Sequence, residues 1–321
     1  MWKSSHRLPT VGAMRVAVTG SSGLIGSALV DSLECDGHDA VRLVRRAPRS
    51  AGEVRWDPLA GTIDAAALEG IDAAVHLAGE GIGEKRWSAA QKQRILDSRV
   101  LGTDLLARTL ADLDAGPAVL VSGSAIGWYG PRGDEVLTEH SPPGTGFLAE
   151  VARHWELATA AAEAAGIRVV HLRTGIVLSR RGGSLGRLLP LIRLGVGGPL
   201  GTGRQWWSWV SLDDEVGLIR HAIGTPTVRG PMNATAPEPA RNADVIRALG
   251  RALHRPTVLP APSFALRLVL GREMADEVVL AGQRVVPEVA TETGYGFRHP
   301  DLASAVAAVV DHGTPRERRA R

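Results

Sequence analysis

The sequence has one cysteine and two tyrosines in 321 residues, and only three of its 37 basic residues are lysines. The single cysteine, Cys35, excludes an internal disulfide and suits a reducing compartment. No apolar run approaches the ~18 residues that a membrane-spanning helix needs, and the opening "MWKSSHRLPTVGA" lacks the apolar core of a secretion signal. No two of the ten histidines are three or four residues apart, so no metal site is expected. We therefore expect a cytoplasmic protein with no metal and no membrane partner.

The basic charge is spread along the chain. The 37 basic and 34 acidic residues give a net charge of +3, and the one small basic cluster is the tail "RERRAR". Proteins that bind nucleic acids usually concentrate basic residues on one face, so we expect no nucleic-acid partner. Hydrophobic residues make up 44% and charged residues 22%, which is typical of a globular protein.

The first half of the chain alternates between strand-like and helix-like segments. The apolar runs "RVAVTG", "DAVRLVRR", "DAAVHLAGE", "PAVLVSGSA" and "IRVVHLRTGIVL" have the composition of buried parallel strands. Helical patterns separate them at Leu24 to Glu34, Ala89 to Leu113 and Leu148 to Ala165. This alternation predicts an α/β fold with a doubly wound parallel sheet.

The pattern changes after Val177, where glycine and tryptophan become frequent. We predict helices at "LDDEVGLIRHAIG", "NADVIRALGRAL" and "ADEVVLAG", and a short strand at "PMNATA". The predicted organisation is a Rossmann domain over 14–177 and a smaller α+β substrate-side domain over 178–312, with segments that return to the first domain. Residues 1–13 and 313–321 are predicted to be loose tails.

The stretch "VAVTGSSGLIGSALV" predicts a phosphate-binding turn between the first strand and the first helix. Its glycines follow the spacing G-x-x-G-x-x-G, which permits an unusual turn, a close approach of pyrophosphate to the backbone, and tight packing of helix on strand. The amide groups at the start of the helix then point at the anion. The predicted contacts are Gly20, Ser22, Gly23, Leu24, Ile25 and Gly26.

The end of the second predicted strand indicates which dinucleotide is bound. NAD-specific proteins place an acidic residue about 20 positions after the glycines, where it binds the ribose 2′-hydroxyl. This chain has Arg45 and Arg46 there. Guanidinium groups suit a 2′-phosphate, so we predict NADP(H) rather than NAD(H). The alternative is that both arginines are simply solvated on the surface.

Further motifs resemble the extended short-chain dehydrogenase/reductase (SDR) superfamily. Asp72, Val75, His76 and Ala78 match its D-x-V-x-H-x-A segment, and "RVLGT" resembles its "N-V-x-G-T" helix with Arg99 in place of the asparagine. "WVSLDDE" and "GPMNATA" resemble later superfamily segments.

A closer resemblance is to a branch of atypical SDR proteins described as epimerase-family or cell-division-inhibitor-like. It extends from about Met14 to Val310 and is carried by "RWDPLAG", "HLAGEGIGEKRWS", "SAIGWYG", "GVGGPLGTGRQWWSWV" and "GQRVVPEVATETGYGFRHPDL". The resemblance implies NADP(H) binding and no established substrate. It also implies that the cofactor is contacted by Leu77, Ala78, Gly79, Arg99 and Val177.

The proton-transfer pair of the superfamily is missing. Its hydride transfer uses a serine, a tyrosine and a lysine four residues after the tyrosine. Neither Tyr129 nor Tyr295 is followed by such a lysine, and Phe147 and Val151 stand at the places of the pair. Those two side chains cannot exchange protons.

Two residues are candidates for the remaining chemistry. "VSGSAIGWYG" resembles the superfamily's serine segment with one inserted residue, which places Ser124 at the catalytic serine. Ser124 then either polarises a carbonyl or caps the strand end. Tyr129 either replaces the missing acid or fills the pocket wall beside Trp128.

The run Arg204, Gln205 and Trp206, followed by two more tryptophans, has an unusual local composition. With Trp128, these three residues are our candidates for a substrate pocket that takes a planar or sugar-like ligand. Packing between the domains explains the tryptophans equally well.

Two functions from different classes follow. The first is an NADP(H)-dependent oxidoreductase or epimerase that acts on a small carbonyl or sugar-like substrate without the Tyr-x-x-x-Lys pair. The second is a non-catalytic NADP(H)-binding redox sensor or scaffold. Relatives commonly form homodimers through helices of the first domain, but here the segments around Ala89 and Leu148 carry enough charge on one face to stand in solvent. Formation of a homodimer is therefore left as an open alternative.

Overall fold

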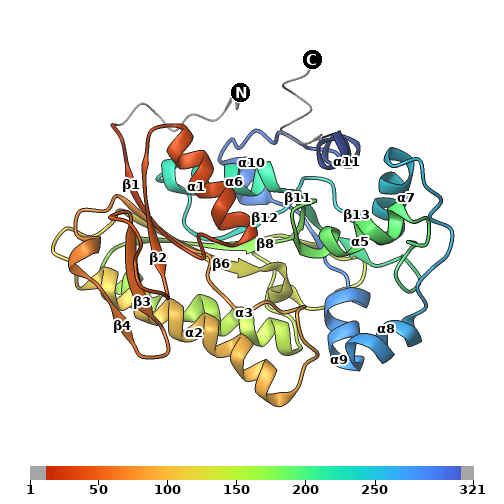
Figure 1. The fold of residues 1–321 in the computed structure, drawn as a ribbon, viewed down its shortest axis with the longest axis horizontal. Coiled ribbons are helices and arrows are strands. Elements are labelled where there is room, and N and C mark those ends of the chain that lie inside the picture. Colours follow the sequence, from red (N-terminus) through yellow and green to blue (C-terminus); the bar gives the residue numbers. More distant parts are fainter. Residues whose placement is uncertain (1–11, 312–321) are drawn as a thin grey trace.

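The computed structural model describes residues 12–311. An eight-stranded sheet in the order β12-β8-β6-β5-β1-β2-β3-β4 lies at its centre, with helices on both faces (Figure 1). The predicted α/β class with a mostly parallel sheet is therefore confirmed. Residues 1–11 of the predicted N-terminal tail, and residue 312 with the whole predicted tail 313–321, lie outside the described residues.

The strands of this sheet pair in parallel, except for the last at one edge. Each predicted apolar run forms one of them, and "PMNATA" forms the strand at the other edge. "EVRWD" was not predicted as a strand because its alternating charged residues mask the apolar pattern. The strands are β1 (Arg15–Thr19), β2 (Asp39–Val44), β3 (Glu53–Asp57), β4 (Thr62–Ile63), β5 (Ala73–His76), β6 (Val119–Ala125), β8 (Arg168–Thr174) and β12 (Gly230–Ala234).

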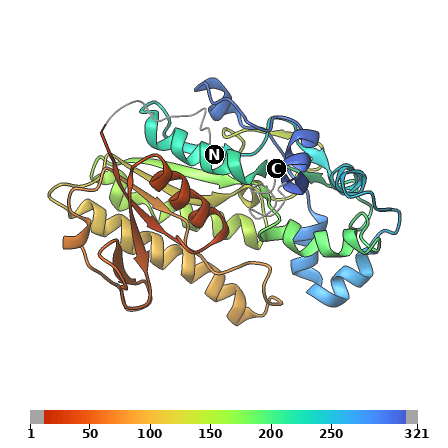
Figure 2. The ribbon, with the colours of Figure 1, turned by 45° about the horizontal axis from the view of Figure 1, so that its top comes forward.

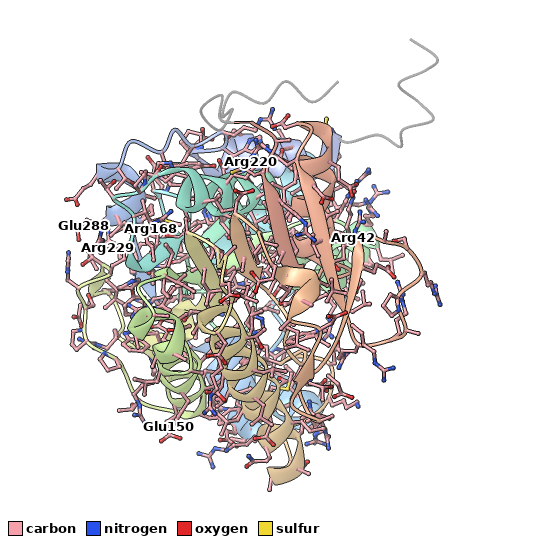
Figure 3. The ribbon with its side chains drawn as sticks, turned by 90° about the vertical axis from the view of Figure 1, so that its left-hand side faces the viewer. Arg42, Glu150, Arg168, Arg220, Arg229 and Glu288 are labelled. Atoms are coloured by element: carbon pink, nitrogen blue, oxygen red, sulfur yellow. The ribbon has the colours of Figure 1, made fainter. Side chains whose placement is uncertain are left out.

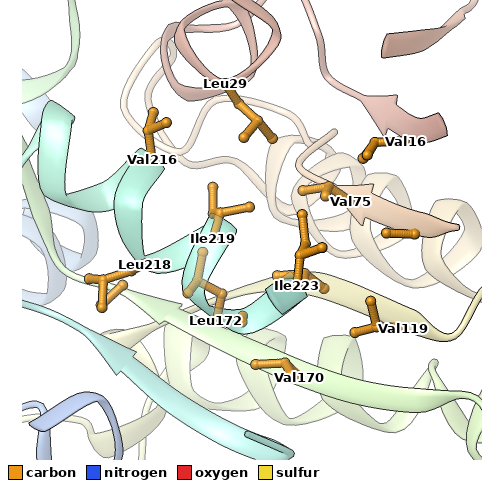
Figure 4. Close-up of a cluster of buried hydrophobic side chains, with 14 of the residues drawn as sticks. Val16, Leu29, Val75, Val119, Val170, Leu172, Val216, Leu218, Ile219 and Ile223 are labelled. Carbon is orange, nitrogen blue, oxygen red and sulfur yellow. The ribbon is translucent and has the colours of Figure 1, made fainter. Parts of the chain in front are cut away.

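Helices α1 (Leu24–Cys35) and α6 (Leu212–Gly224) cover one face of the sheet, and α2 (Ala89–Ala111), α3 (Phe147–Leu157) and α4 (Ala160–Ala164) cover the other (Figure 2). The first face is packed with branched side chains such as Leu29, Val75 and Ile219 (Figure 4). Burying this apolar surface is what holds the helices on the sheet. The single helix predicted over 148–165 is interrupted at Thr159, whose hydroxyl donates to the carbonyl of Glu156.

The second half of the chain adds a group of short elements beside the carboxyl ends of the strands. Trp209, Leu189 and Val245 are among the side chains that form its own apolar core. Its elements, with the short ones from the first half, are η1 (Ala66–Leu68), η2 (Ile126–Tyr129), β7 (Val136–Leu137), β9 (Ile176–Leu178), α5 (Gly183–Arg193), β10 (Trp206–Trp207), β11 (Trp209–Ser211), β13 (Ala240–Arg241), α7 (Asn242–Ala252), α8 (Ser263–Leu270), α9 (Arg272–Met274), the π-helical η3 (Ala275–Leu280), β14 (Arg284–Val285), α10 (Glu288–Glu292) and α11 (Leu302–Asp311).

Two segments from the second half of the chain, β12 and α6, belong to the central sheet and to the helices that cover it. β12 pairs with β8, and α6 packs beside α1, where Arg220 donates to the hydroxyl of Ser32 at 2.7 Å. Figure 3 shows the width of the sheet: Arg42 on β2 and Arg229 just before β12 lie on opposite sides of the view. Within residues 12–311, no helix combines the length and apolarity of a membrane span.

Candidate functional site

The glycine turn between β1 and α1 leaves no room for side chains. Gly20 has a φ of +66°, and a Cβ atom there would lie 2.7 Å from the carbonyl carbon of Leu77. A Cβ on Gly26 would lie 2.2 Å from the carbonyl oxygen of Gly20. Both distances are far below van der Waals contact, so the turn requires glycine at these positions.

The start of α1 is open to an anion. Its N-cap is Gly23, and no side chain within residues 12–311 forms a capping hydrogen bond at this end of the helix. Ser22 is exposed beside it, while Leu24 and Ile25 form the half-buried first turn. The uncapped amide groups and the helix dipole favour a phosphate at this place. The predicted cradle residues therefore lie together in a geometry that fits the pyrophosphate of a dinucleotide.

Thr19, which the sequence analysis did not single out, fixes the neighbouring loop. Its Oγ1 accepts the backbone N–H of Leu77 at 3.1 Å and that of Ala78 at 3.2 Å, and it hydrogen-bonds His76 Nδ1 at 2.8 Å. These bonds join the end of β1 to the end of β5. The segment from Leu77 to Gly79 thus lies beside the glycine turn, and its contact with the cofactor stays a prediction.

The two arginines after β2 have different surroundings. The guanidinium of Arg46 donates to both carboxylate oxygens of Glu53, at 2.7 and 2.5 Å, and to the carbonyl of Ala47. The hydrogen bonds from Arg46, and then from the backbone of Arg49, lower the pKa of Glu53 to about 2. Arg45 is exposed and has no hydrogen-bonded or ion-paired partner among the residues that the structure describes. Arg45 is therefore the arginine of the pair that is free to bind a phosphate.

Arg99 lies on α2 against the loop after β5. Its Nη1 donates to the carbonyls of Glu80 and Ile95, each at 3.0 Å, and its guanidinium lies over the ring of Trp155. Burial lowers the pKa of Arg99 to about 10, so the group is still charged at neutral pH. These contacts hold the turn at Gly79 in place. Val177, the other residue implied by the resemblance, lies on β9 opposite Val210 of β11.

Ser124 and Tyr129 belong to one buried chain of hydrogen bonds. Ser124 Oγ donates to Glu156 Oε1 at 2.7 Å, and Arg173 forms a bidentate ion pair with the same carboxylate at 2.8 and 2.9 Å. Arg173 Nη1 also donates to the hydroxyl of Tyr129 at 3.0 Å, and that hydroxyl donates to Asn233 Oδ1 at 2.7 Å. Glu156, Arg173 and Asn233 were not among the predicted site residues. Charged residues inside the otherwise apolar segments of β8 and α3 were the available signal.

Within this series of hydrogen bonds, the hydroxyl protons of Ser124 and Tyr129 are both already donated to other side chains. Tyr129 is fully enclosed, and burial raises the pKa of its phenol to about 12. Ser124 is 4% exposed, and its proton points at Glu156. Trp128 lies beside them, with the guanidinium of Arg173 4.0 Å from its ring centre. The roles of Ser124 and Tyr129 in proton transfer stay predictions.

Two carboxylates of the C-terminal segment, Glu273 and Glu277, contact α2 and α3 close to Phe147, which stands at the position of the superfamily's tyrosine. The backbone N–H groups of Phe147 and Leu148 each donate to Glu277 at 3.0 Å, so a side chain of η3 caps α3. Lys92 Nζ lies 4.7 Å from the ring centre of Phe147 and 2.6 Å from Glu273. An ammonium group thus lies over the residue that replaces the tyrosine.

The predicted substrate residues separate into distinct environments. The side-chain amide of Gln205 donates to the carbonyls of Leu200 and Val279, which occupies its donors within the protein. Trp206 is half-buried and donates from Nε1 to Asp134 at 2.7 Å, while Arg204 is exposed. The tryptophans that follow, at 207 and 209, are buried in the core of the second half, and not between the two domains as the packing alternative had it.

No group of three or more His, Cys, Asp or Glu side chains within residues 12–311 could hold a metal ion.

The sequence profile of the NAD dependent epimerase/dehydratase family matches residues 16–233. The chain belongs to this family. A domain of unknown function (DUF1731) matches residues 261–309, which include the capping residue Glu277. The epimerase family protein Mb2239 of Mycobacterium bovis is 47% identical over 291 residues, which cover 91% of this chain and 96% of that protein. The human epimerase family protein SDR39U1 is 37% identical over 300 residues, which cover 92% of this chain and all of that protein.

Two solved structures of epimerases or epimerase-family proteins have folds similar to that of this chain. The crystal structure of human epimerase family protein SDR39U1 (isoform 2) with NADPH has a TM-score of 0.87 at 34% identity, and the match covers 94% of this chain and 100% of that one. The nucleoside-diphosphate sugar epimerase from Corynebacterium glutamicum has a TM-score of 0.77 at 38% identity, over 96% of this chain and 60% of that one. The predicted membership of an epimerase-like branch of the SDR superfamily is confirmed.

Proposed function

We propose that this protein binds NADP(H) and acts as an oxidoreductase or epimerase on a small carbonyl or sugar-like substrate. The observation that carries the proposal is the combination of two features: a glycine turn without side chains at the start of α1, and Arg45 after β2, which has no partner among the described residues. The human relative crystallised with NADPH supports the choice of cofactor.

Each part of the site has a defined task in this proposal. The amides at the start of α1 bind the pyrophosphate, and Arg45 binds the 2′-phosphate with Arg46 held beside it by Glu53. Leu77 to Gly79 border the ribose on the nicotinamide side, and Val177 lines the pocket beyond it. When bound, NADP(H) supplies or accepts the hydride.

Ser124 is the group that we assign to the substrate oxygen. Its proton is directed at Glu156, so in this state the serine oxygen is an acceptor and its lone pairs face away from the carboxylate. To donate to a substrate carbonyl, the Ser124 hydroxyl has to rotate away from Glu156. The carboxylate of Glu156 then still accepts both hydrogen bonds from Arg173. Tyr129 reaches the same carboxylate only through Arg173. The geometry therefore favours Ser124 over Tyr129 as the residue that meets the substrate.

A specific observation favours a second function. Phe147 and Val151 stand where the superfamily has its proton-transfer pair, and the remaining candidate protons are committed within a buried chain. A protein with that arrangement can bind NADP(H) and report its redox state through protein contacts without turning over a substrate.

An assay of substrate turnover distinguishes the enzyme from the non-catalytic sensor. Purified protein is incubated with NADPH and a panel of aldehydes, ketones and sugar nucleotides, and oxidation of the nicotinamide is followed by absorbance. An oxidoreductase oxidises NADPH with at least one compound, and an epimerase converts a sugar nucleotide to its epimer in the presence of NADP⁺ with no net change in the cofactor; Ser124→Ala slows either reaction and Tyr129→Phe affects it less. Tight binding of the cofactor without NADPH oxidation and without epimer formation across the panel supports the sensor. Unchanged turnover in Ser124→Ala refutes the proton role of Ser124.

Two proposals concern the setting of the protein. The single cysteine supports a cytoplasmic location. The spread of basic charge supports a protein without a nucleic-acid partner.

A further inference from the structure

Two guanidinium groups converge on the ring of Trp206. The Cζ of Arg241 lies 3.9 Å from the ring centre and that of Arg284 lies 4.7 Å from it. Three chain segments supply these side chains: β10 carries Trp206, β13 carries Arg241 and β14 carries Arg284. Asp134, just before β7, completes the group by accepting from Trp206 Nε1 at 2.7 Å and from Arg241 at 2.6 Å. We call these four residues the Trp206 cluster.

The backbone fixes the position of each member. Trp206 pairs directly with Arg241 in the β10–β13 ladder, and Arg284 pairs with Val136, two residues after Asp134, in the β14–β7 ladder. A Cβ on Gly282 would lie 2.4 Å from the backbone nitrogen of Trp206, so this segment packs against β10 without a side chain between them. The cluster is therefore built into the fold and does not depend on flexible surface loops alone.

The charges of the cluster do not balance. Two guanidinium groups face one carboxylate, an excess of one positive charge. The hydrogen bonds of Trp206 and Arg241 lower the pKa of Asp134, so its carboxylate is ionised at neutral pH. Two like charges on one indole repel each other, and a further anion would relieve that repulsion.

Arg284 is the member with free donors. Arg241 donates to Asp134 and to the backbone carbonyl of Arg204. Arg284 is half-buried, and no hydrogen-bond acceptor contacts its guanidinium among the residues that the structure describes. Stacking on Trp206 holds the planar guanidinium in one orientation, and its N–H fork matches two oxygens of a phosphate or carboxylate.

Ser208 connects the segment that carries Trp206 to the segment proposed to line the cofactor pocket. The hydroxyl of Ser208, two residues after Trp206, donates to the carbonyl of Gln283 at 2.7 Å. The carbonyl of Ser208 packs against Gly175, where a Cβ would approach it to 2.3 Å. Gly175 leads directly into β9 and Val177, the residue proposed to line the nicotinamide side.

We propose that the Trp206 cluster binds an oxyanion group, a phosphate or a carboxylate, of the substrate, with Arg284 as the principal ligand. This inference rests on the proposed function and narrows it, because the substrate is then an anionic carbonyl or sugar-like compound. Arg284 is a specificity-determining residue in this account, and it takes no part in hydride or proton transfer.

The test uses the full chain saturated with NADP⁺, so that the phosphate cradle at α1 is already filled. Inorganic pyrophosphate and malonate are titrated at constant ionic strength, and the indole N–H signal of Trp206 is followed by NMR, assigned with Trp206→Phe. Wild-type protein shows a saturable shift of this signal with at least one probe. Arg284→Ala weakens the binding by about tenfold or more, and Arg284→Lys retains part of it.

Arg229→Ala is the matched control. Arg229 is an exposed arginine that precedes β12 at the amino-terminal edge of the sheet, away from the cluster, and its loss leaves the shift unchanged. A Trp206 signal that moves with neither probe, or that moves equally in Arg284→Ala, overturns the inference. Thermal unfolding of each variant shows that it is folded. Failure of NADP⁺ itself to bind refutes the proposed function instead, and it is measured separately before any probe is added.

Discussion

We expect replacement of Arg45 by alanine to weaken the binding of NADPH and to leave the binding of NADH almost unchanged. Arg45 has no partner among the described residues, so its removal costs no hydrogen bond within the folded chain. Its proposed contact is one charge-assisted interaction with the 2′-phosphate, and such bonds contribute about 1.5–3 kcal/mol. At about 1.4 kcal/mol per factor of ten, Arg45→Ala weakens NADPH binding by roughly 10- to 150-fold. Because Arg45 is exposed, we expect the lower end of this range at physiological salt.

The assay is calorimetric titration of both cofactors at two ionic strengths. NADH lacks the 2′-phosphate, so its affinity stays within about twofold of the wild-type value, and the melting temperature does not change. Arg46→Ala is the comparison variant: it also weakens NADPH binding, because the freed carboxylate of Glu53 then repels the phosphate, and the pKa of Glu53 rises from about 2. Equal losses for NADPH and NADH in Arg45→Ala, or no loss for either, refute the assignment of Arg45.

Three further substitutions test other parts of the structure. Gly26→Ala abolishes NADPH binding and lowers stability by about 1–3 kcal/mol in urea unfolding, because the new methyl group overlaps the turn before α1; normal binding contradicts the cradle. Tyr129→Phe leaves two buried hydrogen-bond partners unsatisfied and costs about 1–3 kcal/mol, and a neutral effect argues against the buried chain. Burial raises the pKa of Glu215 to about 8, so the folded state binds an extra proton and stability falls as pH rises from about 4.5 to 8. Glu215→Gln therefore stabilises more at pH 8 than at pH 5, and equal melting shifts at both values contradict this.

The sheet and its helices were largely predictable because their signals are local. A strand such as β1 is a short apolar run followed by glycine, and α6 coincides with the segment predicted from its amphipathic pattern. β3 was missed because charged residues alternate with its buried ones, Val54 and Trp56, in a strand near the sheet edge. The interruption of the helix at Thr159 depends on a side-chain hydrogen bond that no periodicity indicates.

The glycine turn between β1 and α1 was predictable for the same reason. Glycine spacing and the residues at the end of the next strand are features of a continuous stretch of chain, and the structure places them together. The difference between Arg45 and Arg46 was not visible in the sequence. It arises because Glu53, on a strand that was not predicted, lies within reach of one arginine and not of the other.

The chemistry around Ser124 and Trp206 depends on pairs far apart in the chain. Glu156 and Arg173 meet Ser124 only because α3 packs on β6 and β8. Arg284 reaches Trp206 only because β14 returns to β7 after a long excursion through the C-terminal helices. Composition identified the tryptophan run as unusual, but its charged partners required the fold.

The central claim is that the glycine turn and Arg45 bind NADP(H) in preference to NAD(H). The most direct measurement is a titration of the purified wild-type protein with NADPH and with NADH, followed by tryptophan fluorescence. The account predicts saturable binding of NADPH at least tenfold tighter than that of NADH, a ratio that one charge-assisted contact with the 2′-phosphate supports. Equal or tighter binding of NADH, or binding of neither cofactor, contradicts it.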